Sequence, residues 1–223
     1  MTTTSPSERT RVRRVPDRGV YDREAIEHIL DEALIAHVGF EVDGAPAVIP
    51  TAFWRTKDRF YFHGSSTSRM VRVLRDGVPC CVCVTLLDGI VLARSAFHHS
   101  MNYRSVVIYG RATELSEPDR KQAALEAFTE KLAPGRWRGI RLPTPQELNA
   151  TAVMSLPIDE ASAKVRSGPP VDEEADYALP VWAGVVPLRM AAAEPVPDPR
   201  LPPSVPIPEH ARHFMRRSTP SND

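Results

Sequence analysis

Three short apolar runs separated by two turn signals, within residues 36–63, constrain the fold of this chain most. The pair Asp43-Gly44 is typical of two-residue β-hairpins, and Lys57-Asp58 marks a second turn. Strands joined by turns this short run antiparallel. The segment therefore predicts a three-stranded antiparallel meander, with strands at residues 36–42, 45–55 and 59–63.

The rest of the chain adds more strands than helices. Residues 87–89, Leu-Asp-Gly, are expected to turn a further hairpin. Asp22 is the expected N-cap of the first helix, and Thr144 with Glu147 forms a capping-box pattern. A strand-rich meander closes most economically as a barrel, so the predicted class is mainly β, a small antiparallel barrel with a few helices. Further strands are expected at residues 79–87, 90–95, 103–115, 151–158 and 181–188, and helices at 22–35, 69–75 and 117–132.

Prolines mark the C-terminal boundary of the domain. The chain has 22 prolines against 11 glycines, and seven of the prolines lie within residues 195–208. Such a tract lacks backbone donors and favours an extended chain. We therefore expect one domain at residues 19–190 and a Pro-rich tail at 191–223. Residues 1–18, which contain five arginines, are expected to be a basic, flexible arm.

The charge balance argues against one class of partner. Lys and Arg number 28 and Asp and Glu number 28, so the net charge is zero, whereas proteins that neutralise nucleic-acid phosphates are normally basic. The longest apolar run, residues 78–87, is about half the length that a membrane span needs. The first residues carry no apolar signal segment. We expect a cytoplasmic protein with no nucleic-acid and no membrane partner.

All three cysteines, Cys80, Cys81 and Cys83, lie in one apolar run. Cys80 and Cys83 have the spacing of a C-x-x-C pair, but a redox pair of that kind places its thiolate at a helix N-terminus. This run is rich in β-branched residues, so we interpret the cysteines as core residues of a buried strand.

Common catalytic motifs are absent from the sequence. No G-x-G-x-x-G follows a strand, and there is no Walker A loop, no G-x-S-x-G elbow and no H-E-x-x-H. The histidine pairs His98-His99 and His210-x-x-His213 are interpreted as surface residues. No metal site is predicted.

Residues 61–69 (Tyr-Phe-His-Gly-Ser-Ser-Thr-Ser-Arg) form the candidate binding segment. A strand ends, a glycine follows, four hydroxyl side chains come next, and Arg69 opens a helix. Hydroxyls, free helix N–H groups and an arginine together suit a phosphate. The alternative is an ordinary strand–loop–helix junction in which Ser68 or Thr67 caps the helix. The segment alone does not decide between these interpretations.

Three motifs follow one another along the chain: residues 48–54 (Val-Ile-Pro-Thr-Ala-Phe-Trp), 61–69, and 100–106 (Ser-Met-Asn-Tyr-Arg-Ser-Val). Together they resemble the pyridoxamine 5′-phosphate oxidase-like family of FMN-binding split barrels. The resemblance is closest to the branch of nitroimidazole reductases and flavin-nucleotide-binding proteins. It covers about residues 12–190 and continues in family order at residues 147–151, 163–166 and 182–188.

The resemblance implies a phosphate site at the second motif. Ser65, Ser68 and Arg69 would hold the FMN phosphate next to Gly64. Many relatives have lysine where Arg69 stands. Either charge serves a phosphate, and arginine adds a bidentate geometry.

The resemblance also implies a ring site. Arg104 would be the cation near flavin N1, and His63 and Tyr103 are the candidate proton donors, since the catalytic residues are otherwise unknown. For His63, Tyr103 and Trp182 the alternative is an ordinary packing role. The residues expected around the ring or ribityl chain, some of them from a partner subunit, are Pro50, Thr51, His63, Asn102, Tyr103, Arg104 and Trp182.

The implied function is that of an FMN-dependent oxidoreductase. NAD(P)H would reduce the flavin, which would then reduce a small oxidised organic compound such as a nitro compound. The alternatives are a flavin- or haem-binding protein without catalysis, a pyridoxamine-phosphate-type oxidase, and a deazaflavin-dependent reductase. Because the family builds its site at a dimer interface, a homodimer is expected.

Overall fold

The computed structural model describes residues 6–214. The strands there are β1 (Gly19–Val20), β2 (Ile35–Val42), β3 (Ala45–Thr56), β4 (Arg59–Ser65), β5 (Pro79–Leu92), β6 (Ser100–Arg111), β7 (Thr113–Glu114), β8 (Thr151–Pro157), β9 (Ala161–Arg166) and β10 (Gly184–Pro187). The α-helices are α1 (Arg23–Glu32), α2 (Arg69–Arg75), α3 (Pro118–Leu132), α4 (Pro145–Ala150) and α5 (Glu209–Arg212).

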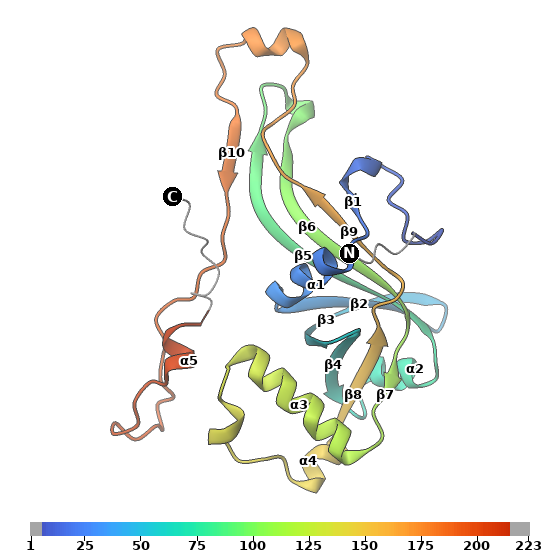
Figure 1. Ribbon diagram of the computed structural model, residues 1–223, viewed down its shortest axis with the longest axis vertical. Coiled ribbons are helices and arrows are strands. Elements are labelled where there is room, and N and C mark those ends of the chain that lie inside the picture. The colour runs from blue at the N-terminus through green and yellow to red at the C-terminus, as the bar shows by residue number, and fades with distance from the viewer. Residues whose placement is uncertain (1–5, 215–223) are drawn as a thin grey trace.

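The strands form one antiparallel sheet in the order β1-β9-β6-β5-β2-β3-β4-β8-β7, with β10 added to β5. Two halves of the sheet meet at β3, which pairs with β2 along its first part and with β4 along its second. The chain passes from β6 directly to β7 and from β8 to β9, so it joins the two ends of this order and the sheet curls into a barrel (Figure 1). The predicted class, a mainly β, small antiparallel split barrel with a few helices, is confirmed.

Several local predictions are confirmed as well. Asp43 and Gly44 have positive φ angles of 52° and 75°, as the type I′ turn between β2 and β3 requires. The Asp22 carboxylate caps α1. Thr144 and Glu147 form the complete capping box of α4.

The predicted hairpin at residues 87–89 is wrong. β5 continues to Leu92 with a bulge between Leu87 and Gly89, and it pairs with β6 on both sides of the bulge. The Leu188 N–H donates to the Asp88 carbonyl at 3.0 Å, so β10 closes over the segment that we expected to turn.

Other boundaries also differ from expectation. The first helix ends at Glu32 rather than at residue 35, because Ile35 already begins β2. The expected strand at residues 103–115 is two strands, β6 and β7. The pattern does not predict β9, because its sequence, Ala-Ser-Ala-Lys-Val-Arg, contains a single β-branched residue and no aromatic one.

The main core fills the barrel. Phe53, Phe60 and Phe62 are each less than 2% exposed, and they pack with Leu30 of α1 and Leu74 of α2. The rings of Phe53 and Phe60 stack with their centroids 4.7 Å apart. Burying each such side chain contributes about 1.5–3 kcal/mol, so these contacts fix the two halves of the barrel against each other.

A second cluster lies on the outer face of β3, β4 and β8, beneath α3. Trp54 and Val153 are buried there, Leu115 lies at the edge, and Phe128 of α3 packs on top. Successive side chains of a strand point to opposite faces, so Phe53 faces the barrel interior while Trp54 faces α3.

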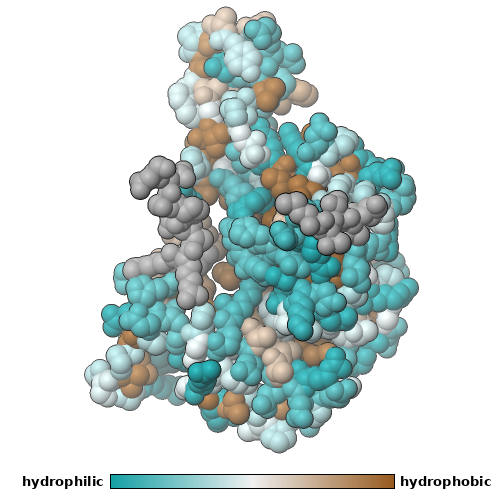
Figure 2. All heavy atoms as spheres, viewed as in Figure 1, coloured by the Kyte–Doolittle hydropathy of each residue, from teal (hydrophilic) through white to brown (hydrophobic). Residues whose placement is uncertain are grey.

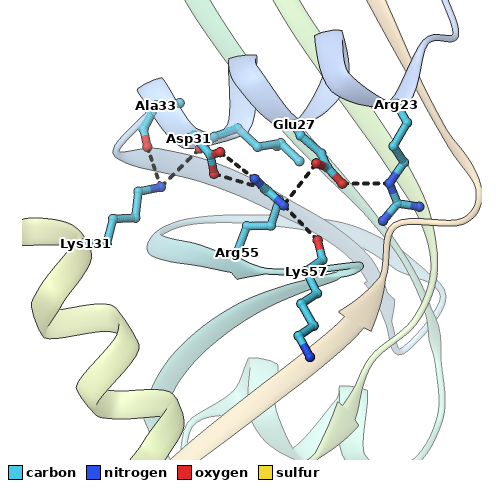
Figure 3. A network of polar contacts seen from close by, with 8 residues as sticks. Arg23, Glu27, Asp31, Ala33, Arg55, Lys57 and Lys131 are labelled. Carbon is cyan, nitrogen blue, oxygen red and sulfur yellow. Dashed lines mark hydrogen bonds and ion pairs between the residues drawn. The ribbon is translucent and has the colours of Figure 1, made fainter. Parts of the chain in front are cut away.

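Two lysines hold α3 on this outer face. Lys121, the buried residue of α3, donates to the Leu148 carbonyl of α4 at 3.0 Å. Lys131 donates to the carbonyls of Leu30 and Ala33 at the C-terminal end of α1, at 3.1 and 2.9 Å (Figure 3). Carbonyls at a helix C-terminus carry partial negative charge, so these contacts are electrostatically favourable.

The two ends of the chain behave differently. The side chains of Ser7 and Arg9 hydrogen-bond to Glu160, and Thr10 is buried, so this part of the arm packs on the barrel, whereas a free arm was expected. The described part of the Pro-rich tail, residues 191–214, is exposed almost throughout and runs beside the barrel (Figure 1). The remaining parts of the predicted arm and tail, residues 1–5 and 215–223, lie outside the described residues.

Beyond the barrel, the ends of β5 and β6 project together with β10 and the loop at residues 169–183 (Figure 1). We call this part the extension. Hydrophobic side chains are visible along it in the space-filling view (Figure 2). Its large exposed apolar residues are Phe97, Met101, Val171, Tyr177, Leu179, Val181, Trp182 and Val186.

The cysteine run is the first part of β5, as predicted, but the prediction that all three cysteines are core residues is wrong for Cys81 and Cys83. Cys80 is buried, whereas Cys81 and Cys83 point to the other face of the strand and are half-buried. Cys80 and Cys83 therefore do not face each other. Within residues 6–214, no three His, Cys, Asp or Glu side chains gather as a metal site. No helix in that range is both long and apolar enough to cross a membrane.

Candidate functional site

The hydroxyl-rich loop connects β4 to α2. Ser65 ends β4, and its hydroxyl lies 3.0 Å from the hydroxyl of Thr67; both residues are exposed. The Ser66 N–H donates to the Ala150 carbonyl at 2.9 Å, which ties the loop to the end of α4. The hydrogen bond to Ala150 thus fixes the position of the loop, while the hydroxyls of Ser65 and Thr67 are exposed to solvent.

Ser68 is the N-cap of α2, as the alternative interpretation of this segment predicted. Its hydroxyl oxygen accepts a hydrogen bond from the Val71 N–H at 3.3 Å. This capping role leaves the hydroxyl proton of Ser68 free to be donated outward. Since α2 has only seven residues, an anion here would depend on side chains more than on a helix dipole.

Arg69 is the first residue of α2 and is exposed. In the described part of the chain, no carboxylate forms an ion pair with its guanidinium, in contrast to Arg75 at the other end of the helix, which pairs with Glu114. Arg69 is therefore a positive charge available to a ligand next to the Ser65–Thr67 hydroxyl pair.

Pro50 and Thr51 lie on β3 and point to opposite faces of that strand. Pro50 is exposed on the outer face, directly across from His37 of β2. The Thr51 hydroxyl donates to the Ala52 carbonyl at 3.2 Å. The exposed residues at Pro50 and His37 form an uncovered part of the outer sheet face, beside the part that α3 covers.

His63 and Gly64 precede the loop on β4. Gly64 pairs with Ala152 of β8 as an ordinary strand residue. The His63 ring packs against Phe128 of α3, with centroids 4.8 Å apart, and against Trp54, at 5.9 Å. Burial lowers the pKa of His63, which favours the neutral imidazole. Its Nδ1 is shielded from solvent and has no hydrogen-bond partner among residues 6–214.

Arg104 is occupied by two carboxylates. It forms ion pairs with Glu32 of α1 and with Asp88 in the bulge of β5, the latter at 2.7 Å. Hydrogen bonds to Glu32 and then to Asp88 raise the pKa of Arg104. Its charge is neutralised within the chain, so this geometry does not support the predicted role as a cation beside the flavin.

Asn102 is also occupied. It is 8% exposed, accepts a hydrogen bond from Arg166 and donates one to the Gly168 carbonyl at 3.2 Å. Tyr103 is a half-buried strand residue across from Leu87 of β5. Asn102 is hydrogen-bonded to Arg166 of β9, and Tyr103 is the residue of β6 that pairs with Arg166. Both residues therefore lie where the extension meets β9.

Trp182 lies in the loop before β10 and is 66% exposed. Its ring folds back over Gly184, where an added Cβ would lie 3.0 Å from Trp182 Cζ2. The alternative to a role beside the flavin was that Trp182 fills the core. Its exposure shows that it does not do so in this chain.

The structure thus brings together one group of predicted residues and separates a second group from it. The first group lies on β3, on the neighbouring strand β4 and in the β4–α2 loop, with Pro50 and Thr51 on the part of β3 that pairs with β2. The second group lies on the extension, and strands β5 and β2 stand between β6 and β3, a lateral separation of roughly 14 Å at ordinary strand spacing. The first group is Pro50, Thr51, His63, Gly64, Ser65, Ser68 and Arg69, and the second is Asn102, Tyr103, Arg104 and Trp182.

Two residues next to His63 were not predicted as part of the site. Trp54 and Phe128 enclose the inner side of its ring. The signal for Trp54 was its alternation with Phe53, which places it on the outer face of β3, as His63 is on β4. For Phe128, no signal in the sequence links α3 to β4.

Comparisons with known proteins agree with the fold. A family model described as pyridoxamine 5′-phosphate oxidase matches residues 22–165. The structure of the flavocytochrome Anf3 from Azotobacter vinelandii has 48% sequence identity and a TM-score of 0.90, and the match covers 94% of this chain and 98% of that one. No curated protein matches the chain at a significant level.

Two further structures are similar. The FAD and haem binding protein from Mycobacterium smegmatis has 37% identity and a TM-score of 0.85, over 88% of this chain and 97% of that one. A 5-nitroimidazole antibiotic resistance protein from Bacteroides thetaiotaomicron, at 22% identity, a TM-score of 0.56 and 66% and 86% coverage, shares the fold. Since the family model spans well over half of its length, this chain belongs to the pyridoxamine 5′-phosphate oxidase family.

Proposed function

We propose that this protein is a flavin-dependent oxidoreductase that holds the flavin phosphate at residues 65–69. The observation that carries the proposal is that the exposed Ser65 and Thr67 hydroxyls lie close in the chain to Arg69, whose guanidinium forms no ion pair with a carboxylate among residues 6–214. Charge-assisted hydrogen bonds from arginine suit a phosphate. Two relatives, at 48% and 37% identity, are a flavocytochrome and an FAD-binding protein, which supports the same function.

The flavin is either FMN, as the sequence resemblance implies, or FAD. FAD contains the same riboflavin phosphate with an added AMP group, so the same loop serves both. The 37% identical relative binds FAD, and this favours the larger cofactor. A deazaflavin remains the less supported alternative.

When bound, a flavin supplies hydride and electron transfer. Arg69 and the loop hydroxyls would bind its phosphate, and the exposed edge of β3 at Pro50 would orient its ring. His63 faces outward two residues before the loop and would exchange a proton with the bound ligand, since its burial favours the neutral form. Arg104 would stabilise the fold through its ion pairs with Glu32 and Asp88 and would not contact the flavin.

The reaction itself is a finer proposal. Reduction by NAD(P)H, followed by reduction of a small oxidised compound such as a nitro compound, remains the prediction from the family resemblance. The fold shared with the nitroimidazole resistance protein is compatible with it. Oxidation of a pyridoxamine phosphate is less supported, because the family's Arg-and-His substrate motif is not matched here: Arg212 and His213, near the C-terminus, lie in the exposed tail.

Haem binding is the second candidate, and the two most similar structures described above favour it, since one is a flavocytochrome and the other binds haem. An imidazole must be neutral to bind iron. Burial favours that state in His63, and the ring lies next to the flavin loop, so we propose His63 as the ligand. His37 is exposed on the same outer sheet face, and its substitution serves as the control for substitution of His63.

A homodimer would unite the two groups of site residues. The extension exposes a row of large apolar side chains, among them Trp182, Val181 and Phe97, and such patches mark interaction surfaces. A second copy that packed its extension near the β4–α2 loop would bring Trp182 to the flavin. The expected dimer can be checked by mass measurement in solution.

The experiment that tests the proposed function is identification of the bound chromophore. The protein is purified, its visible spectrum is recorded, and the chromophore is released by heat and identified by mass. FAD or FMN supports the flavin proposal, and a Soret band that disappears in His63→Ala but persists in His37→Ala supports the haem proposal. A protein that is colourless and does not take up added flavin contradicts the main proposal.

A further inference from the structure

Two ring nitrogens on side chains that pack against each other are buried without partners among residues 6–214. Trp54 is 1% exposed, and its indole Nε1 has no hydrogen-bond partner among residues 6–214. The same holds for Nδ1 of His63, whose ring centroid lies 5.9 Å from that of Trp54. Buried polar atoms are nearly always paired, so two such atoms on neighbouring side chains require an explanation.

The chemistry of the two atoms is complementary. An indole N–H can only donate, whereas Nδ1 of a neutral imidazole can accept. The two rings are tilted by 48° and the two atoms do not bond to each other directly. A small polar molecule between them would satisfy both.

Phe128 of α3 packs against both the Trp54 ring and the His63 ring and covers the contact between them. Its ring lies 5.1 Å from that of Trp54 and 4.8 Å from that of His63. The hydrogen bonds of Lys121 and Lys131 hold the two ends of α3 in position. A molecule beneath Phe128 would therefore be retained and would exchange slowly with bulk solvent.

We propose that one internal water bridges Trp54 Nε1 and His63 Nδ1, and that Trp54 is thereby a positioning residue for His63. The water accepts the indole proton and donates to Nδ1, which leaves the imidazole proton on the outward-facing Nε2. Because water can also accept, the bridge would persist if Nε2 held a metal ion and Nδ1 carried the proton. The bridge fixes the orientation of the ring in both states.

The role of Nε2 rests on the proposed function, but the bridge itself does not. It is tested on the cofactor-free protein by nitrogen NMR of the His63 ring. Wild-type protein is expected to show mainly the tautomer with its proton on Nε2. Trp54→Phe, which keeps an aromatic ring but removes the donor, should shift His63 toward a mixture of tautomers. Tyr61→Phe, which alters the same aromatic stack without removing that donor, should leave the tautomer unchanged.

A high-resolution crystal structure of the wild-type protein provides the check that needs no variant. Ordered water density within hydrogen-bond distance of both nitrogens supports the proposal. Its absence, or a His63 spectrum that is the same in Trp54→Phe as in wild type, overturns the proposal. If the bridge is present in a protein that binds no flavin or haem, the proposed function fails and this inference stands.

Discussion

The ammonium of Lys131 lies 2.9 Å from the carbonyl oxygen of Ala33, so the last turn of α3 is hydrogen-bonded to the C-terminal end of α1 (Figure 3). This contact fixes the helix that covers the inner side of His63. It also places an ammonium group in a largely buried position, near Asp31 and Arg55.

Burial lowers the pKa of Lys131 from its ordinary value of 10.5 to about 8. Between these two values the unfolded chain binds more protons at this group than the folded chain does, so its contribution to the unfolding free energy rises with pH. We expect the stability difference between wild type and Lys131→Met to change by about 3 kcal/mol in favour of wild type across this range. Urea denaturation measures it. In Lys57→Met, the exposed control, the pH profile should run parallel to wild type, and parallel profiles for Lys131→Met would refute the expectation.

Arg104→Gln tests whether this arginine holds the fold or the flavin. Glu32 and Asp88 would lose their partner, so we expect the unfolding free energy to fall by about 1–3 kcal/mol. The pKa of Glu32, which the hydrogen bond from Arg104 lowers, should move back up. Flavin affinity and reduction potential should stay close to wild type. A lowered potential with unchanged stability would instead restore the predicted role beside flavin N1.

The three cysteines should differ in reactivity. Burial raises the pKa of Cys80 to about 11, and the thiolate is the reactive form. Cys83 lies on the outer face of β5 and is half-buried. We expect alkylation of the native protein near neutral pH to modify Cys83 well before Cys80, as mapped by peptide mass spectrometry. Equal rates at the two sites would show that β5 does not bury Cys80.

Gly89→Ala should loosen β10. An added Cβ would lie 2.9 Å from Val185 Cγ1 and 3.0 Å from the Val186 carbonyl oxygen, so the strand must move away from the bulge. We expect a loss of about 1–3 kcal/mol and faster amide exchange in β10. Gly139→Ala, where nothing lies within 4 Å of the added Cβ, is the matched control. Unchanged exchange in β10 would mean that the close contact at the bulge does not constrain it.

The contrast between residues 43–44 and residues 87–89 shows that the same turn signal does not always predict the same structure. Both contain Asp-Gly, but Asp43-Gly44 turns a hairpin while Asp88-Gly89 forms a bulge in a continuous strand. The difference comes from tertiary contacts, since Arg104 binds the Asp88 carboxylate and β10 covers Gly89. Local sequence cannot show such contacts.

The residues of the candidate site also fall into two classes, those that local sequence predicts and those that depend on distant contacts. The loop at residues 65–69 was predictable because its hydroxyls and arginine are adjacent in sequence and directly follow Gly64. The pairing of Arg104 with Glu32, 72 residues away, was not, and neither was the cover that Phe128 provides over His63. Residues whose role depends on a distant partner need the fold before they can be interpreted.

The central claim is that Arg69 holds the flavin phosphate, and the most direct measurement is flavin affinity of the cofactor-free protein by titration. Losing one charge-assisted contact and adding a repulsive carboxylate should weaken binding in Arg69→Glu by at least tenfold, about 1.4 kcal/mol or more. Arg72→Glu makes the same change of charge one turn further along α2, at an exposed position, and should bind flavin within about twofold of wild type. Equal affinities for wild type, Arg69→Glu and Arg72→Glu would contradict the account.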